Sequence, residues 1–216
     1  MKNSTQGALR KRFLIGGIIA VFALLAGTWS ALQLRDRGSG HVDELAATRF
    51  PIPRDINTFA LVDQHGDPFT NSALQGVWSF LFFGYTHCPD VCPTTLSVLN
   101  SVAQQLGSEV RDVRFVFVTV DPERDTPEHL ARFVGYFNGD FIGVTGEPGD
   151  IERLAGQLGV LYMRVAGTDN PDSYLMDHTA GVFLVDPDGK YHAVFMPPLT
   201  AERITADFRK IRAAYQ

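Results

Sequence analysis

The chain has two cysteines, and both lie in one short segment. Cys88 and Cys92 belong to the run HCPDVC, with three residues between them. A cysteine pair can form a reversible disulfide, provide the nucleophile of a peroxide-reducing enzyme, or supply two thiolate ligands to a metal ion. The residue types alone leave these three chemistries open.

The cysteines follow a segment typical of a buried strand. The run VWSFLFFGY, residues 77–85, is apolar almost throughout, as in strands covered on both faces of a sheet. Leucine, valine and alanine recur at helical spacing over residues 92–106, which predicts a helix starting near Cys92. The pair would then lie at the carboxyl end of a central strand, the edge where α/β folds place their sites. Free N–H groups and the helix dipole favour a thiolate there.

The spacing of the pair bears on the choice among these chemistries. Oxidoreductases of the C-x-x-C kind have one residue less between the sulfurs, which favours closure of a small disulfide loop. Here the longer loop, Pro89 to Val91, still permits a disulfide, and it also suits two thiolates that clamp one metal ion. Soft sulfur ligands select Cu(I) or zinc. Such a chelate needs at least a third donor.

Histidine is the expected third donor, and His178 is the best placed of the six histidines. It stands beside Asp177 in LMDHTAGVFLVD, where the chain enters an apolar strand that we expect next to the first one. His87 adjoins Cys88, so its side chain should point away from that sulfur, and a role behind the ligands or during transfer stays open. The others are expected in a linker, a turn, the start of a helix and an exposed strand, without a role as ligand: His41, His65, His129 and His192.

Strands and helices alternate from residue 56 to the C-terminus. A hairpin around residues 63–67 precedes the cysteine strand and its helix, and VRFVFVTVD is a second buried strand. Thr126 and Pro127 have the residue types of an N-cap and first position of the next helix. A further strand and helix, a polar loop over residues 166–176 that we expect to be mobile, a hairpin turning at DPDG and a terminal helix complete the chain. This order predicts an α/β fold with a mixed central sheet flanked by helices.

The N-terminal region has the composition of a membrane anchor. Residues 13–34 are uncharged and, as a helix, would span roughly 33 Å, enough to cross a bilayer. More Lys and Arg precede this run than follow it, which predicts a cytoplasmic tail (1–12), a transmembrane anchor (13–34), a linker (35–55) and an external domain (56–216). A cleaved signal peptide is the alternative, but no convincing small-residue cleavage site follows the run.

The charge of the chain excludes one class of partner. From residue 38 onward there are 13 Lys and Arg against 23 Asp and Glu, so the external domain is acidic. An acidic domain is a poor nucleic-acid binder. The short tail is unlike an organellar transit peptide, which favours a bacterial inner membrane with the domain in the periplasm.

Three segments resemble the signature segments of a known family. FFGYTHCPDVCPTTL, VTVDPERDTPEHL and DHTAGVFLVDPDG are similar to those of the Sco (SenC/PrrC) family of membrane-anchored, thioredoxin-fold copper proteins that assist cytochrome c oxidase assembly. The resemblance covers roughly residues 56–214 and implies a thioredoxin-like fold with an N-terminal hairpin extension. It further implies copper, as Cu(I) or Cu(II), bound by Cys88, Cys92 and His178, with Asp177 behind the ligands or on a partner-facing surface.

The same resemblance implies a function and its partners. A protein of this kind is a metallochaperone that receives copper from a periplasmic donor. It delivers the copper to the subunit of the oxidase that carries the dinuclear copper site. We therefore expect a copper carrier rather than an enzyme.

Two other functions would use the same cysteines. A thiol-disulfide reductase would keep the copper-site cysteines of the oxidase reduced, with Cys88 and Cys92 as its redox pair. Against it, DHTAGV has no proline where redox members of the thioredoxin fold usually carry a cis-proline. The run CPTT suggests a peroxiredoxin-like peroxidase, but a peroxidatic cysteine needs a nearby arginine, and none lies between Arg54 and Arg111. Thiol reduction is the alternative we retain.

Two further groups of residues have the types found in metal sites. The methionines Met163, Met176 and Met196 are few and dispersed, which favours packing roles, although Met176 is two residues from His178. Three acidic residues alternate in VDPERDTP and have the oxygen ligands of a hard-metal site: Asp121, Glu123 and Asp125. A strand end followed by a capped helix accounts for most of this second pattern without any metal.

Overall fold

The computed structural model describes residues 27–29, 45–166 and 174–215. The chain divides into two compact units, residues 1–44 and 45–216, and every candidate site residue belongs to the second. The expected anchor, 13–34, lies outside the described residues except for 27–29, which are helical. Within the described residues, no helix is both long enough and apolar enough to cross a membrane.

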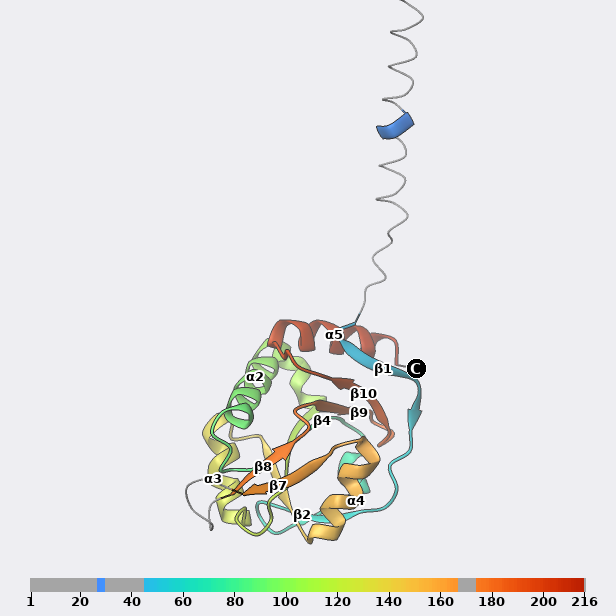
Figure 1. Ribbon diagram of the computed structural model, residues 1–216. Coiled ribbons are helices and arrows are strands. Elements are labelled where there is room, and N and C mark those ends of the chain that lie inside the picture. Colours follow the sequence, from blue (N-terminus) through green and yellow to red (C-terminus); the bar gives the residue numbers. More distant parts are fainter. Residues whose placement is uncertain (1–26, 30–44, 167–173, 216) are drawn as a thin grey trace, which may run out of the picture. The chain divides into compact units, whose positions relative to one another are not determined.

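An eight-stranded sheet forms the centre of the second unit (Figure 1). Its order is β1-β10-β9-β4-β5-β6-β2-β3, with β4, β5 and β6 parallel and the other neighbours antiparallel. The mixed sheet confirms the predicted α/β class. The strands are β1 (Ala47–Arg54), β2 (Ala60–Asp63), β3 (Pro68–Thr70), β4 (Trp78–Gly84), β5 (Val113–Thr119), β6 (Ile142–Thr145), β9 (Val182–Val185) and β10 (Tyr191–Phe195).

The cysteine strand β4 lies in the interior of this sheet. All seven of its residues are buried, as its uninterrupted apolar sequence predicts. It pairs in parallel with β5, with Gly84 opposite Thr119, and on its other side with β9. The carboxyl ends of β4 and β5 therefore meet at one edge of the sheet, and the loops that follow them lie next to each other.

Helices pack against the sheet through large aromatic side chains. Phe208 of α5 (Ala201–Ala213) lies 5.1 Å from Phe80 between ring centroids, and Phe133 of α3 (Pro127–Phe137) lies 5.4 Å from Phe117. The helix α2 (Val91–Leu106) contacts both α5 and α3, while α4 (Pro148–Leu158) contacts β2. Short 3₁₀ helices, η1 (Asn71–Leu74) and η2 (Gly107–Asp112), precede β4 and β5. The Thr126 side chain caps α3 by accepting a hydrogen bond from the His129 N–H, as predicted.

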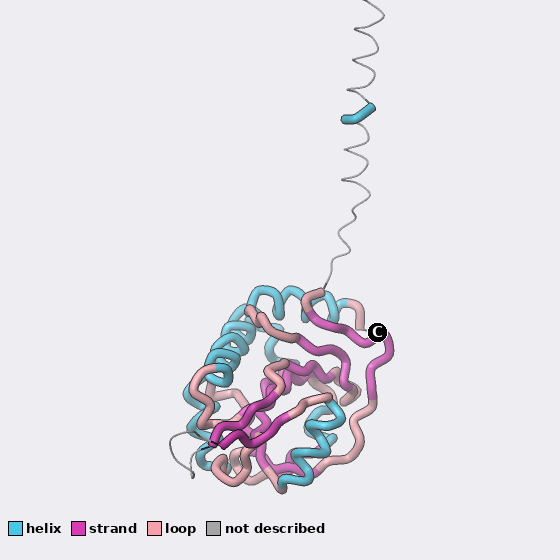
Figure 2. The backbone as a smooth tube through the Cα atoms, viewed as in Figure 1, coloured by secondary structure: helices cyan, strands magenta, loops and turns pink. Residues whose placement is uncertain are grey.

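A separate two-stranded ribbon accompanies the main sheet. It consists of β7 (Tyr162–Ala166) and β8 (Tyr174–His178), orange in Figure 1 and visible as a second group of strands in Figure 2. Tyr162 pairs with His178 and Ala166 with Tyr174. The expectation of a loop over residues 166–176 is thus wrong for 166, which ends β7, and for 174–176, which begin β8, and residues 167–173 lie outside the described residues.

Part of the expected linker belongs to the sheet. Residues 47–54 form the edge strand β1, antiparallel to β10. Its Phe50 ring packs on Tyr191 at 4.7 Å. Pro51 and Pro53 are tolerated because an edge strand needs no hydrogen bonds on its outer side, and they break the period of two by which a strand is recognised in sequence.

His192 also differs from expectation, because it is buried rather than exposed. Its Nδ1 lies 3.1 Å from Asp186 Oδ2, and its ring packs edge-on against Trp78 at 5.4 Å. Tyr215, just after α5, covers the same histidine at 6.0 Å. The sequence could not reveal this burial, since Trp78 belongs to a strand far from His192 along the chain.

Candidate metal centre

Strand β4 and helix α2 position the two cysteines. Cys88 lies in the loop that leaves β4 and is half-buried, whereas Cys92 is the second residue of α2 and is fully buried. The Cys92 N–H donates to the Cys88 Sγ over 3.4 Å. The first sulfur therefore faces a free N–H group at the beginning of α2, as the predicted helix start implied.

Gly84, the last residue of β4, makes room for the Cys92 sulfur. A Cβ at this position would lie 2.7 Å from the Cys92 Sγ and 2.8 Å from the Phe117 ring. Real Cβ atoms essentially never approach a neighbour that closely. A lone glycine at the end of the bulky run SFLFFG was the sequence signal for this close approach, and our sequence reasoning missed it.

The ribbon brings His178 to the cysteines from 86 residues away along the chain. Its Nε2 lies 3.5 Å from the Cys92 Sγ. Its Nδ1 is 3.2 Å from the Thr179 carbonyl, which can only accept, so Nδ1 carries a proton and Nε2 is the nitrogen that faces the sulfurs. The rings of Phe82 and Tyr85 pack around the imidazole at 6.0 and 6.1 Å.

The three predicted ligands converge. Potential ligand atoms of Cys88, Cys92 and His178 all lie within 4.8 Å of one another. In the described part of the chain, no other group of three or more histidine, cysteine or acidic side chains is arranged in this way. Two soft sulfurs and one imidazole fit the donor preferences of Cu(I) or zinc.

Hydrogen bonding between the cysteines separates their acidities. The Cys92 thiol donates to the Cys88 sulfur, and this bond, aided by the backbone of Asp90 and Cys92, lowers the pKa of Cys88 from its ordinary value to about 5 against the opposing effect of burial. Ionisation of the Cys92 thiol would break the same hydrogen bond and create a buried charge, so the pKa of Cys92 is raised. At neutral pH the pair therefore holds one proton and one thiolate.

The structure places the other candidate residues outside this donor group. His87 is exposed, with Nδ1 3.1 Å from the Thr86 hydroxyl, and His129 bonds the Arg124 carbonyl at 2.9 Å. His65 is exposed in the β2–β3 turn, and His41 lies outside the described residues.

The two residues before His178 lie on opposite faces of β8. Asp177 is exposed and, because side chains alternate along a strand, lies on the opposite face of β8 from His178, so it does not stand behind the ligands. Met176 shares the His178 face and is half-buried. Met163 and Met196 are exposed, at 62% and 48%.

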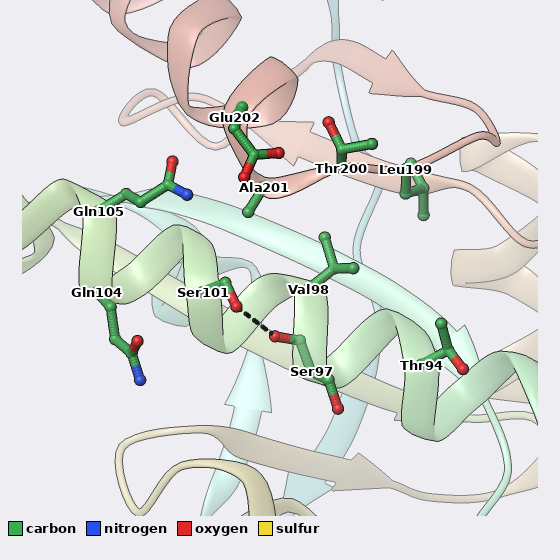
Figure 3. A pocket seen from close by; sticks show the side chains of 10 residues that line it. All are labelled: Thr94, Ser97, Val98, Ser101, Gln104, Gln105, Leu199, Thr200, Ala201 and Glu202. Carbon is green, nitrogen blue, oxygen red and sulfur yellow. Dashed lines mark hydrogen bonds between the residues drawn. The ribbon is translucent and has the colours of Figure 1, made fainter.

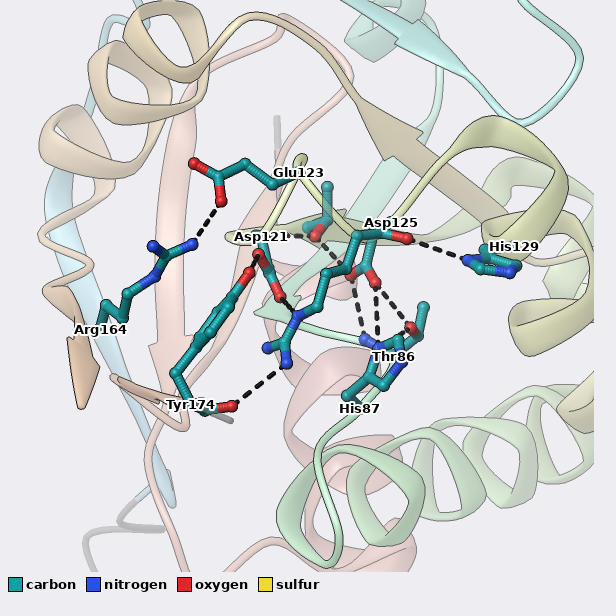
Figure 4. A network of polar contacts seen from close by, with 10 residues as sticks. Thr86, His87, Asp121, Glu123, Asp125, His129, Arg164 and Tyr174 are labelled. Carbon is teal, nitrogen blue, oxygen red and sulfur yellow. Dashed lines mark hydrogen bonds and ion pairs between the residues drawn. The ribbon is translucent and has the colours of Figure 1, made fainter. Parts of the chain in front are cut away.

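The acidic residues of VDPERDTP serve as hydrogen-bond acceptors (Figure 4). Asp125 accepts from Thr86 and Thr119, Asp121 accepts from Tyr174, and Glu123 pairs with Arg164. No hard-metal cluster forms among them in the described residues. The loop also brings the Arg124 guanidinium to within 5.7 Å of the Tyr85 ring centroid.

One hollow on the surface borders the cysteines, and a second, wider one does not. An opening of about 350 Å³ borders the ligands, between the cysteine loop and the ribbon, and Val91, Val165 and Leu175 contribute its apolar wall. A wider depression of about 810 Å³ lies between α2 and the start of α5 (Figure 3). Its lining of Ser, Thr and Gln side chains has Glu202 as the one ionisable group, so it offers no metal or nucleophilic chemistry.

Comparison with known proteins identifies the family. The sequence profile described as SCO1/SenC matches residues 53–213, which include the three converging side chains. The chain belongs to the SCO1/SenC family. This SCO1/SenC protein is 33% identical over 210 residues to the human protein named Protein SCO2 homolog, mitochondrial, a match that covers 96% of this chain and 77% of the human one.

Solved structures agree with this SCO1/SenC assignment. ScoI from Bradyrhizobium japonicum with copper bound is 37% identical with a TM-score of 0.65, covering 72% of this chain and 98% of its own. ScoI from Arabidopsis thaliana with copper bound is 32% identical with a TM-score of 0.69, covering 74% and 100%. The thioredoxin-like fold is thereby confirmed, and the copper-bound relatives together with the Cys-Cys-His group identify copper as the metal of this SCO1/SenC protein.

Proposed function

We propose that this SCO1/SenC protein carries copper through Cys88, Cys92 and His178 and delivers it to the dinuclear copper site of cytochrome c oxidase. The convergence of these three donors within 4.8 Å carries the proposal. Two thiolates and a neutral imidazole give a three-coordinate Cu(I) site, and an added oxygen ligand would accommodate Cu(II). Family membership supports the oxidase as destination, since the resemblance to Sco proteins implies oxidase assembly.

Copper is the cargo here, so the site must release it as well as hold it. Cys88 is only half-buried and borders the opening beside the ribbon, through which cysteines of a client subunit can approach. Those sulfurs replace the ligands one at a time, and copper passes through shared coordination without release to water. His178, a single imidazole at the end of a strand, is the ligand most easily exchanged.

The cellular setting remains part of this proposal. An N-terminal anchor at 13–34, with basic residues before it, would hold the domain on the periplasmic face of a bacterial inner membrane. There the domain could meet both a periplasmic copper donor and the oxidase subunit. The acidic composition beyond residue 38 agrees with a protein partner and not with nucleic acid.

Cu(I) affinity tests the ligand set directly. The full chain, purified reduced in detergent, is titrated with Cu(I) against a competing chelator and compared with His178→Ala, Cys92→Ser and the control His65→Ala. Loss of a ligand should weaken binding at least tenfold in the first two variants. The exposed His65 lies in the β2–β3 turn, outside the donor group, so its variant should match the wild type. Unchanged affinity in His178→Ala would show that His178 is not a ligand.

The low pKa and partial exposure of Cys88 favour thiol-disulfide reduction as the second candidate function. The Cys88 thiolate would attack a client disulfide, forming a mixed disulfide and releasing one client thiolate. Cys92, after losing its proton, would attack Cys88, giving the Cys88–Cys92 disulfide and the second client thiol, so that two electrons pass to the client. If His178→Ala keeps its Cu(I) affinity while Cys92→Ser abolishes both copper binding and thiol exchange, the results would support thiol-disulfide reduction over copper delivery.

A further inference from the structure

The loop 121–125, between β5 and α3, carries two buried carboxylates next to the metal ligands. Asp121 is 2% exposed and Asp125 is 0% exposed. Burying a carboxylate is costly unless partners compensate for its lost hydration. The partners of these two side chains therefore show what the loop holds in place.

Asp125 holds the cysteine loop. Its carboxylate accepts from the Thr86 N–H at 3.0 Å and from the Thr86 hydroxyl at 2.6 Å, and the Thr119 hydroxyl donates to it at 2.6 Å (Figure 4). Thr86 is two residues before Cys88. The end of β5 and the start of the cysteine loop are thus tied to one buried group.

Asp121 and Arg124 hold the ribbon. The Tyr174 hydroxyl donates to Asp121 over 2.8 Å, and Arg124, which is ion-paired with Asp121, donates to the Tyr174 carbonyl over 3.2 Å. Tyr174 is the first residue of β8. Both its side chain and its backbone are therefore fixed to loop 121–125.

Two guanidinium groups enclose the Tyr174 ring. The central carbon of Arg124 lies 3.6 Å from the ring centroid, and that of Arg164, on β7, lies 3.7 Å from it. Two planar cations that close to the centroid cannot share one face, so the ring lies between them. Arg164 also pairs with Glu123 of the same loop, as Figure 4 shows. The electron-rich faces of the ring attract both cations, so these contacts hold Tyr174 in place.

The clamp formed by Asp121, Arg124 and Arg164 on Tyr174 acts on a stiff element. Tyr174 and His178 begin and end one strand and lie on the same face of it, because they are four residues apart. Every residue of β8 pairs with β7, which leaves the strand little freedom to bend. Holding Tyr174 in place therefore fixes the orientation of β8. This orientation in turn sets where the His178 side chain lies relative to Cys92.

We infer that loop 121–125 positions the two halves of the copper site relative to each other, holding the cysteine loop through Asp125 and the His178 ribbon through the clamp on Tyr174. Tyr174 is then a positioning residue that acts on copper only through His178. This inference rests on the proposed function, because it assumes that His178 is a copper ligand.

A double-mutant cycle in the full chain tests the clamp. Cu(I) affinity is measured for Tyr174→Ala, His178→Ala and the double variant, with Tyr136→Ala as the matched control because Tyr136 is 85% exposed and outside the clamp. Tyr174→Ala should weaken Cu(I) binding by about 10-fold or more, the usual effect of losing a residue that orients a ligand. In the His178→Ala background the same change should have no further effect, since the residue it positions is gone. Tyr174→Phe keeps the stacked ring and should lose less affinity than Tyr174→Ala.

A metal-free measurement separates positioning from general damage. In the reduced apoprotein, the NMR signals of the His178 imidazole should shift in Tyr174→Ala and stay unchanged in Tyr136→Ala. An unaltered His178 signal, or an equal loss of affinity in both backgrounds, would overturn the inference. If His178→Ala by itself leaves the affinity unchanged, the proposed ligand set fails instead, and the His178 signal still reports whether the clamp positions this side chain.

Discussion

At the scale of residues, the site depends on an unequal pair of thiols. Cys88 and Cys92 are of one chemical type and lie four positions apart, yet the pKa of the first is lowered and that of the second raised. The difference comes from one hydrogen bond and from burial, which is complete only for Cys92. A thiolate is thus present at neutral pH, whereas the second sulfur, as a proposed copper ligand, would release its proton when the metal replaces it.

The pH dependence of alkylation follows from this asymmetry. Because the thiolate is the reactive form, the rate of Cys88 alkylation by iodoacetamide should rise with pH through a midpoint near 5 and level off above it. Cys92→Ala removes the hydrogen-bond donor, so the midpoint should move upward toward that of an ordinary thiol. Mass spectrometry of the reduced metal-free protein measures both rates. A wild-type midpoint no lower than that of Cys92→Ala would contradict the assigned hydrogen bond.

At the scale of elements, the site is a junction of a strand end, a helix start and a ribbon. Strand β4 and helix α2 were predictable because their apolar patterns are local and nearly uninterrupted. Strand β8 was not, since its alternation covers only five residues and follows a polar segment. The edge strand β1 was missed because its prolines interrupt the expected alternation.

The junction between β4 and α2 predicts a strict requirement at Gly84. Gly84→Ala would place a Cβ against the Cys92 sulfur and Phe117, so the domain should lose about 1–3 kcal/mol of unfolding free energy, and Cu(I) affinity should fall with the displaced sulfur. Gly135→Ala on α3 is the control, because a Cβ there meets nothing within 4 Å. That change should stabilise the helix by about 0.5–1 kcal/mol. Urea unfolding compares the two, and equal stability of both variants would be inconsistent with the close contact at Gly84.

At the scale of the whole molecule, an acidic copper-binding domain follows an uncharged N-terminal run. The proposed transfer of copper between proteins would require the opening beside Cys88 to face a partner, and attachment to a membrane would keep the proposed donor, carrier and oxidase close together. The match to the SCO1/SenC profile begins at residue 53, so the profile concerns the domain and not the run at 13–34.

Removing the N-terminal region tests that arrangement. In a bacterial host, the full chain should sediment with membranes and resist extraction by high salt, whereas a chain lacking residues 1–34 and exported by a cleavable signal should be recovered in the periplasmic fraction. Both should bind Cu(I) alike, because all three proposed ligands belong to the unit 45–216. Oxidase activity in the host should fall when the anchor is absent. Full-length protein in the salt extract would argue against a transmembrane anchor.

Local sequence patterns were enough to predict the α/β class, the order of most elements and the place of the cysteines, because apolar periodicity and helix caps are local properties. The residues next to His178 and its position before an apolar strand also distinguished it from the other histidines. The Sco resemblance implied copper. Tertiary structure decided what depends on distant contacts: the 3.5 Å approach of His178 to Cys92, the unequal acidities of the thiols, the burial of His192 and the clamp on Tyr174. His178 and Cys92 lie 86 residues apart along the chain, and no pattern within either segment specifies the distance between their side chains.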